Sequence, residues 1–452
     1  MRFWIDCHGC AKNDVDGEEI AARLEAAGHD FSQGPGDADL VIVNTCGFIE
    51  DAKKESIQAV LAIKAAHPGK RVLVAGCLAQ RYASQLAADL PEADGIVGNA
   101  DLGAILAAAE ATLAGERPVL VPEAAPSIGI VQRVRRFDYP GTAHVKATEG
   151  CSNFCSFCAI PLIRGALRSR PVLELLGECR DLLDQGVTEL VLIGQDLGSY
   201  GRDFPAQEGP AGAPRLPELL SALSRLDGAF RVRTLYIHPD NFPEGILPVM
   251  AADPRLLPYF DLPFQHGSPR VLKAMNRRGS PGAYLELIAR IREALPDAAI
   301  RSTFLVGFPG ETEEDFERLR DFQERANLDW VGSFAYSREE GTAAYSMGGR
   351  VGARTVAARR ASLEEAQERI TRGRLARFVG GELELLVEER VERASEDEEE
   401  LSLARAWNQA PEVDGLTVLR GSHRPGSLVR ARVLAVNGVD FEAAAVDSRR
   451  PG

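Results

Sequence analysis

Residues 149–158 read Glu-Gly-Cys-Ser-Asn-Phe-Cys-Ser-Phe-Cys, with three cysteines spaced Cys-x-x-x-Cys-x-x-Cys. Three thiolates can hold three irons of a [4Fe–4S] cube, and no fourth cysteine stands nearby to bind the last iron. A metal with an open coordination position is typical of a catalytic site rather than a structural one. The spacing therefore predicts a [4Fe–4S] cluster with one open iron on Cys151, Cys155 and Cys158.

Two other interpretations of these cysteines agree less well with the sequence. A zinc site needs a fourth Cys or His close by, and the next cysteine downstream is Cys179. A disulfide framework needs an oxidising compartment and an even number of cysteines. Eight cysteines in 452 residues are instead typical of a reduced protein with metal-ligating thiols, so we expect a cytoplasmic location.

The composition indicates a multidomain globular protein. A length of 452 residues exceeds one ordinary domain, and a hydrophobic content of 45% is ample for packed cores. The N-terminal residues lack a signal-peptide pattern, and no apolar run approaches the ~20 residues of a membrane helix, so no membrane association is expected. The formal net charge of −14 disfavours stable nucleic-acid binding and suits a basic protein partner.

Residues 1–120 alternate between strand and helix patterns, which predicts a small open α/β domain. Continuous apolar runs at 40–43 and 71–75 are typical of buried parallel strands, and a shorter run stands at 3–5. Helical patterns cover residues 18–27 and 50–66. Ligands of such sheets collect beyond the carboxyl ends of the strands.

Cys10, Cys46 and Cys77 each follow one of these three strands. Thiols at adjacent strand ends can converge, and small neighbouring residues leave room, so one interpretation is a second [4Fe–4S] cluster with an open iron. Another is a set of scattered core cysteines, which are common. A third takes Cys7 and Cys10 as a redox-active Cys-x-x-Cys pair, which leaves Cys46 and Cys77 unexplained.

Residues 121–140 have the composition of a linker, with several prolines and a basic run at 133–136. The region that follows, 137–370, alternates strand patterns with helical ones such as 173–183 and 284–295, which predicts a partial or full (β/α) barrel. The strands are expected at 143–146, 189–193, 232–237, 259–262, 300–306 and 330–334. The cysteine loop follows the first of them, at the end of the barrel where such enzymes keep their chemistry.

Two glycine-containing loops also follow strands of this barrel. The loop at 194–201 contains Gln195, and the loop at 307–312 contains Gly307 and Gly310. Glycine lets a backbone approach a small ligand closely, although each loop alone is equally consistent with an ordinary βα turn. Thr312 followed by Asp315 also predicts a helix N-cap.

Residues 375–446 change character. Short strand patterns at 383–387, 416–419 and 428–433 between Gly and Pro turns predict a small all-β barrel. Acidic residues outnumber basic ones in this C-terminal part, and the acidic run 396–400 is expected at a hairpin tip. The chain is thus expected to be an α/β protein of three domains, at 1–120, 137–370 and 375–446.

The cysteine spacing and the aromatic Phe157 before the last cysteine resemble the radical S-adenosylmethionine superfamily. In that superfamily the open iron binds the methionine end of the cofactor and reduces it to a 5′-deoxyadenosyl radical. The resemblance implies that Phe157, Gln195, Gly307 and Gly310 form the cofactor-binding site. It assigns no catalytic side chain.

The order of the three domains, over essentially the whole chain, resembles the methylthiotransferase family, whose C-terminal domain is a TRAM-like β-barrel. Four motifs resemble the branch that modifies a ribosomal protein: Gly9-Cys10-Ala11-Lys12-Asn13, Asn44-Thr45-Cys46-Gly47, Pro161-x-x-Arg164-Gly165 and Pro411-Glu412-x-Asp414-Gly415. The transfer RNA branch usually carries Gln-Met-Asn after its first cysteine, which is absent here. The chain departs from the family at Ala11, where proline is usual, and in Cys7 and His8.

This resemblance implies methylthiolation of the β-carbon of an aspartate in the twelfth protein of the small ribosomal subunit. One S-adenosylmethionine would methylate a sulfur carried by an auxiliary [4Fe–4S] cluster on Cys10, Cys46 and Cys77, and a second would provide the radical that removes the substrate hydrogen. An electron donor is required as a further partner.

Two other function classes remain open at this point. A transfer RNA adenosine methylthiotransferase is disfavoured by the acidic C-terminal part, which would have to meet phosphates. A non-catalytic iron–sulfur carrier has no need of a large barrel with glycine loops. His266, in the run Phe264-Gln265-His266-Gly267, is interpreted as structural rather than as a site residue.

Overall fold

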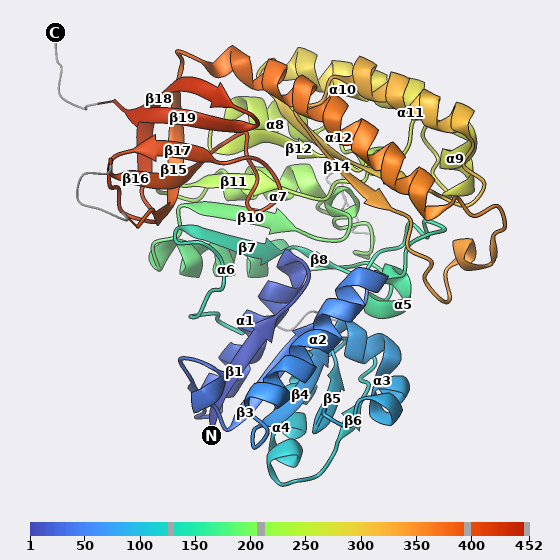
Figure 1. Cartoon of the computed structure of the whole chain (residues 1–452). Helices are drawn as coiled ribbons and strands as arrows, with labels where there is room; N and C mark the ends of the chain where they lie inside the picture. The colour runs from blue at the N-terminus through green and yellow to red at the C-terminus, as the bar shows by residue number, and fades with distance from the viewer. Residues whose placement is uncertain (125–130, 206–212, 393–398, 447–452) are drawn as a thin grey trace.

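The computed structural model describes residues 1–124, 131–205, 213–392 and 399–446. It shows an N-terminal α/β domain below a central curved sheet with its helices, and a C-terminal β-barrel beside that sheet (Figure 1). Across these ranges, no helix is long and apolar enough to span a membrane.

The N-terminal domain contains a six-stranded parallel sheet in the order β2-β1-β3-β4-β5-β6. The predicted strands and the helix at 50–66 are confirmed, and every residue of β3 is buried, as the continuous apolar run indicated. The elements are β1 (Arg2–Cys7), α1 (Ala11–Ala26), β2 (Asp30–Phe31), β3 (Leu40–Thr45), α2 (Glu50–Ala66), β4 (Arg71–Gly76), α3 (Cys77–Asp89), β5 (Gly95–Gly98), α4 (Ile105–Leu113) and β6 (Val119–Leu120).

Helix α1 differs from the prediction because it begins at Ala11 rather than at residue 18. Its first turns contain Lys12, Asn13 and Asp16, which are polar yet buried. Polar residues on a buried helix face hide the apolar periodicity from which helices are predicted. The first part of α1 lies against β7 of the central domain (Figure 1), and this contact explains the burial.

The central domain contains an open parallel sheet in the order β14-β13-β12-β11-β10-β7, which makes it a partial barrel. All six predicted strands are present, and α11 begins with the predicted Thr312–Asp315 capping box. The elements are β7 (Thr142–Lys146), β8 (Thr148–Glu149), α5 (Ile160–Arg164), β9 (Arg168–Ser169), α6 (Val172–Asp184), β10 (Glu189–Ile193), α7 (Leu216–Leu223), β11 (Arg231–Thr234), α8 (Ile246–Ala252), β12 (Leu256–Asp261), α9 (Pro269–Ala274), α10 (Pro281–Ala294), β13 (Ala299–Val306), α11 (Glu313–Ala326), β14 (Trp330–Ala335) and α12 (Ala353–Leu375).

The two faces of this sheet pack against different parts of the chain. In β10, Leu190 and Leu192 belong to the apolar core shared with the outer helices. The alternate residue Val191 belongs to a second core, together with Val15 of α1 and Leu385 of the C-terminal barrel. Because side chains of a strand alternate between faces, the inner face of the partial barrel is covered by the other two domains.

The C-terminal domain is a closed barrel in the order β15-β16-β17-β19-β18. Its strands are β15 (Glu382–Arg390), β16 (Leu401–Ala406), β17 (Thr417–Arg420), β18 (Leu428–Asn437) and β19 (Asp440–Ala445). The sequence pattern predicts three of the five strands but not β16 and β19, because both are rich in alanine, which is a poor strand former. Part of the predicted acidic hairpin tip, 396–398, lies outside the described residues.

The predicted linker does more than connect two domains. Arg133 is 3% exposed, and its guanidinium contacts Glu18 of α1 and Glu178 of α6. It also donates to the carbonyl oxygen of His144 at 2.7 Å. The segment therefore clamps the N-terminal domain onto the central one through a buried cation.

A buried carboxylate holds the C-terminal barrel to the central sheet. Glu189 of β10 accepts from Arg231 Nε at 2.5 Å, from Arg233 Nε at 2.9 Å and from Arg405 Nη1 of β16 at 2.6 Å. Although burial alone would raise it, the three guanidinium groups hold the pKa of Glu189 well below its usual range. At a second contact, the hydroxyl of Tyr259 donates to Asp414 at 2.5 Å.

We expect the substitution Glu189→Gln to destabilise the protein by about 3–5 kcal/mol, because it leaves buried guanidinium groups without their carboxylate. The free energy of unfolding from urea denaturation measures the change. Glu382→Gln is a matched control, since Glu382 pairs with Arg430 and Arg432 on the barrel surface, and it should leave the unfolding midpoint unchanged. Equal effects of the two substitutions would contradict the role of Glu189.

Candidate functional site

The first cysteine loop connects β8 to α5 and is held by backbone contacts. Gly150 has a φ of +71°, and a Cβ on it would lie 2.1 Å from the carbonyl oxygen of Ala166, so only glycine is tolerated there. The amide of Cys151 donates to the carbonyl of Gly165 at 3.1 Å, and the amide of Cys158 donates to that of Cys155 at 3.0 Å. These bonds fix the backbone on which all three thiols stand.

The three thiols of this loop lie among polar side chains of the central domain. Asn153 Nδ2 donates to Cys151 Sγ at 3.4 Å, and His238 Nε2 lies 3.9 Å from Cys155 Sγ. Burial raises the pKa of Cys151 to about 11 and that of Cys158 to about 12. Thiols in such surroundings lose their protons when a metal binds, which is the behaviour of buried metal ligands.

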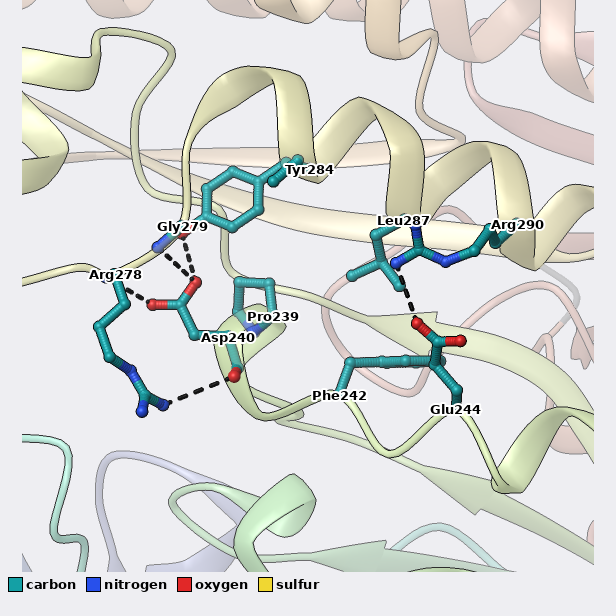
Figure 2. A pocket seen from close by; sticks show the side chains of 10 residues that line it. Pro239, Asp240, Phe242, Glu244, Arg278, Gly279, Tyr284, Leu287 and Arg290 are labelled. Atoms are coloured by element: carbon teal, nitrogen blue, oxygen red, sulfur yellow. Dashed lines mark hydrogen bonds and ion pairs between the residues drawn. The ribbon is translucent and has the colours of Figure 1, made fainter.

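His238 is positioned by Arg277 and by the segment that contains Asp240. Burial, followed by the nearby Arg277 cation, lowers the pKa of His238 to about 4, so the ring is neutral near pH 7 and its Nε2 accepts from Arg277 at 2.6 Å. Figure 2 shows how Asp240 accepts from the amides of Arg278 and Gly279, at 2.8 and 3.1 Å. The hollow in that figure is lined by residues around Asp240 and by helix α10, including Tyr284 and Arg290.

The second set of cysteines lies at one edge of the N-terminal sheet. Cys10 is the N-cap of α1, Cys46 follows β3, and Cys77 begins α3 after β4. Since β1, β3 and β4 are adjacent and parallel, their carboxyl ends bring these residues to the same edge, as the sequence predicted. A Cβ on Gly9 would lie 2.8 Å from Cys46 Cβ, which shows how closely the segments approach.

Burial differs within this set, and only Cys10 is exposed. Burial raises the pKa of Cys46 to about 12 and also raises the pKa of Cys77. Asn99 Nδ2 donates to Cys77 Sγ at 3.3 Å, and Cys77 Sγ lies 3.5 Å from Asn13 Oδ1. In this set, one thiol is therefore open to solvent and two are enclosed.

Cys7 occupies a different environment. A Cβ on Gly17 of α1 would lie 2.4 Å from Cys7 Sγ and 3.0 Å from the ring of Phe137, so this thiol packs against the helix. Cys7 and Cys10 are both free thiols. The neighbouring His8 pairs with Asp6 Oδ2 at 3.1 Å. These contacts favour a structural role for Cys7 and His8.

A buried ion network lies between the two sets of cysteines. Arg164, which follows Cys158 in the first loop and is the last residue of α5, donates to Asp16 Oδ2 and to Glu149 Oε1, both at 2.8 Å. Lys146 pairs with the same two carboxylates, at 2.5 Å to Asp16 and 3.0 Å to Glu149. Arg164 also donates to Asn13 Oδ1 at 2.7 Å. The network therefore ties the start of α1 to the first cysteine loop.

All four ions of this network are at most 7% exposed. Burial alone would raise the pKa of Glu149, but Arg164 and Lys146 hold it well below its usual range. The arrangement is dry and its charges compensate each other, so it fixes the two domains in one relative position.

The predicted cofactor residues fall in two groups. Phe157 packs against the apolar cluster that contains Phe308, next to Gly307, so the structure brings Phe157 and the 307–312 loop together. The amide of Gly307 donates to Glu311 Oε2 at 2.6 Å. Gly310 instead turns towards Gly349, whose carbonyl accepts from its amide at 2.7 Å.

Gln195 lies beside the ion network. Its Nε2 donates to Glu149 Oε1 at 3.1 Å. Its Oε1 is buried and has no hydrogen-bond partner among the described residues, and the same holds for the hydroxyls of Thr148 and Thr234. These unsatisfied polar atoms belong to β8, to the loop after β10 and to the end of β11, and they could bind a polar ligand.

His266 is fully buried, and its Nδ1 accepts from the amide of Ser268 at 2.9 Å. Its Nε2 lies 3.7 Å from Glu311. Its Nε2 is also buried without a hydrogen-bond partner among the described residues, so the structural interpretation of His266 stays a prediction.

The chemistry of the predicted ligands suits an iron–sulfur cluster. Within ranges 1–124, 131–205, 213–392 and 399–446, no three His, Cys, Asp or Glu side chains form a ready-made group for one metal ion. All six predicted ligands are free thiols. Neighbouring glycines allow the segments that carry them to pack closely against other backbone. Soft thiolate donors in threes suit a multi-iron cube, whose width spans more space than one ion.

A partial barrel with a three-cysteine loop after its first strand defines a radical S-adenosylmethionine enzyme. Family models agree: residues 145–322 match the Radical SAM superfamily, residues 2–98 match the Uncharacterized protein family UPF0004, and residues 379–446 match the TRAM domain.

The fold also resembles solved structures. The radical S-adenosylmethionine methyltransferase TsrM from Kitasatospora setae has a TM-score of 0.53 at 15% identity, over 76% of this chain and 74% of that one.

Sequence relatives define the family more closely. The ribosomal protein uS12 methylthiotransferase RimO of Treponema denticola is 47% identical over 98% of this chain and 100% of that protein. The RimO of Thermotoga maritima is 39% identical over 95% of this chain and 96% of that protein. The chain belongs to the ribosomal protein uS12 methylthiotransferase family.

We expect Gly150→Ala to abolish cluster binding by the first loop, because the added methyl group collides with backbone. The reconstituted variant should bind about four irons fewer than the unmodified protein. Gly177→Ala is the control, since Gly177 lies in α6 with open space around it, and it should keep the full iron content. Iron analysis after anaerobic reconstitution measures the cluster content of both variants. Full iron in Gly150→Ala would contradict the requirement for glycine at this position.

Proposed function

We propose that this protein transfers a methylthio group to the β-carbon of an aspartate in ribosomal protein uS12. The observation that carries the proposal is the pairing of two cysteine triplets across one buried ion network, in a chain whose relatives bear the name of that activity. Two triplets suit a reaction in which one site generates a radical and the other provides sulfur.

Cys151, Cys155 and Cys158 hold the [4Fe–4S] cluster that binds S-adenosylmethionine, and Cys10, Cys46 and Cys77 hold a second one. Convergence of three adjacent strand ends supports the second cluster, and the separate packing of Cys7 against α1 supports Cys10 as the ligand. When bound, the clusters and S-adenosylmethionine supply the radical and the sulfur.

The residues of the chain bind, orient and exclude water. Phe157, Gln195, Gly307 and Gly310 form the cofactor site in this proposal, with the unsatisfied Gln195 Oε1 as an acceptor for it. Arg164 and Lys146 neutralise the carboxylates of Asp16 and Glu149, which lie between the two triplets. A site without water protects a radical from side reactions.

The partner follows from charge. The chain has a formal net charge of −14, and a basic ribosomal protein, free or in the small subunit, is attracted to such a surface. An external electron donor in the cytoplasm supplies the reducing electron. Stable nucleic-acid binding is not part of the proposal.

The two triplets should be separable by substitution. Changing Cys151, Cys155 and Cys158 together to Ala should halve the iron from about eight per chain to about four and abolish formation of 5′-deoxyadenosine. Changing Cys10, Cys46 and Cys77 together to Ala should also halve the iron, but 5′-deoxyadenosine should still form while methylthioaspartate does not. Iron analysis, chromatography of the nucleoside and mass spectrometry of uS12 measure the three quantities.

Cys7→Ala is the matched control, and it should retain iron and product. Loss of the second cluster in Cys7→Ala would show that Cys7 is the ligand. Methylthiolation of transfer RNA instead of uS12 would overturn the substrate and leave the fold and the clusters in place.

A further inference from the structure

Lys12 is a buried lysine two residues after Cys10, in the first turn of α1. It is 7% exposed. Its Nζ lies 3.2 Å from the centre of the Tyr236 ring, which follows β11 of the central domain. The ammonium therefore reaches from the N-terminal domain to a residue of the central domain that follows a strand of the partial barrel.

The Cys10 thiol, Asp261 and Glu149 act on this ammonium only at longer range. Among the described residues, no hydrogen bond or ion pair joins Lys12 to a side chain or a carbonyl, and its one recorded contact is the face of Tyr236. A largely buried cation gains stability from a counter-ion, so an ammonium held only by an aromatic face favours the binding of an anionic group.

The nearest carboxylates are already occupied. Glu149 is paired with Arg164 and Lys146. Asp261 pairs with Arg301 at 3.3 Å and accepts from the amide of Tyr236 at 3.2 Å. Neither lies within ion-pair distance of Lys12, and both have other partners to satisfy, so the protein does not supply the missing anion itself.

The end of α1 adds to the attraction for an anion. Cys10 is the N-cap and makes no side-chain capping bond, and α1 has sixteen residues. The positive end of the helix dipole thus points to the same space as the Lys12 ammonium. An unpaired buried ammonium and a helix N-terminus together form a site for a carboxylate.

We propose that Lys12 binds the side-chain carboxylate of the acceptor aspartate and is a specificity-determining residue of this enzyme. The inference rests on the proposed function and names the group by which that site selects its substrate. The carbon to be modified is bonded directly to that carboxyl carbon. Fixing the carboxylate beside Cys10 therefore fixes the β-carbon next to the second cluster site.

Binding measurements test the proposal without turnover. The probes are purified uS12 and its acceptor Asp→Asn form, and fluorescence anisotropy reports their affinities for the full-length, reconstituted enzyme. The unmodified enzyme should bind the Asp form roughly 10- to 100-fold more tightly, because a buried charge-assisted hydrogen bond is lost with Asn. Lys12→Met should bind both forms with equal affinity.

The control is Lys54→Met, the same substitution at an exposed lysine paired only with Glu50 at 3.7 Å. It should keep the preference for the Asp form. Lys54→Met should also make 5′-deoxyadenosine from S-adenosylmethionine alone at the unmodified rate. The comparison of the two uS12 forms on the unmodified enzyme needs no variant, so a folding defect of Lys12→Met leaves that arm intact.

Four results would overturn the proposal. Equal affinity of the unmodified enzyme for both uS12 forms, or a preference that persists in Lys12→Met, would show that Lys12 does not hold the carboxylate. A raised KM for S-adenosylmethionine in Lys12→Met would assign the lysine to the carboxylate of the cofactor. A shifted reduction potential of the second cluster with the Asp preference intact would make Lys12 a counter-ion of that cluster.

Failure of the proposed function has a different signature. In that case the unmodified enzyme forms no methylthioaspartate on uS12 at all, whatever the affinities of the two forms.

Discussion

The buried ion pairs between α1 and the residues around the first cysteine loop are the interaction on which the rest of the site depends. Asp16 of the N-terminal domain and Glu149 of the central domain share the same two cations, Lys146 and Arg164. Neither domain satisfies its buried charges alone. The relative position of the two cysteine triplets is thus set by electrostatics that tolerate little displacement, since an uncompensated buried ion costs several kcal/mol.

The same principle recurs at the other domain contact. Glu189 on the central sheet requires Arg405 of the C-terminal barrel, as Glu18 of α1 requires Arg133 of the connecting segment. Apolar packing covers the inner face of the sheet. Apolar contacts tolerate small shifts between domains, whereas buried ion pairs specify one relative position. The three domains therefore behave as one unit around the space between the triplets.

The sequence predicted the fold and the location of the thiols because both depend on local pattern. Apolar runs gave the strands, and the topology of parallel sheets placed Cys10, Cys46 and Cys77 at one edge. It did not predict the first two turns of α1 or the ion network. Their residues are charged, and charge normally indicates solvent; burial becomes visible only when a partner from another domain is placed opposite. Lys12 belongs to a sequence motif, but whether its ammonium has a carboxylate partner depends on which residues the fold places around it.

The clamp formed by Arg133 has a consequence for how the chain folds during synthesis. Helix α1 leaves the ribosome well before Arg133, Lys146 and Arg164 are made, so its acidic face must stay hydrated while the first sheet assembles. Only when the first loop of the central domain emerges can that face become dry. In the nascent chain, Ile20, Ala21 and Leu24 can already dock α1 on the first sheet, whereas the charged residues of its first turns become buried only with residues translated later.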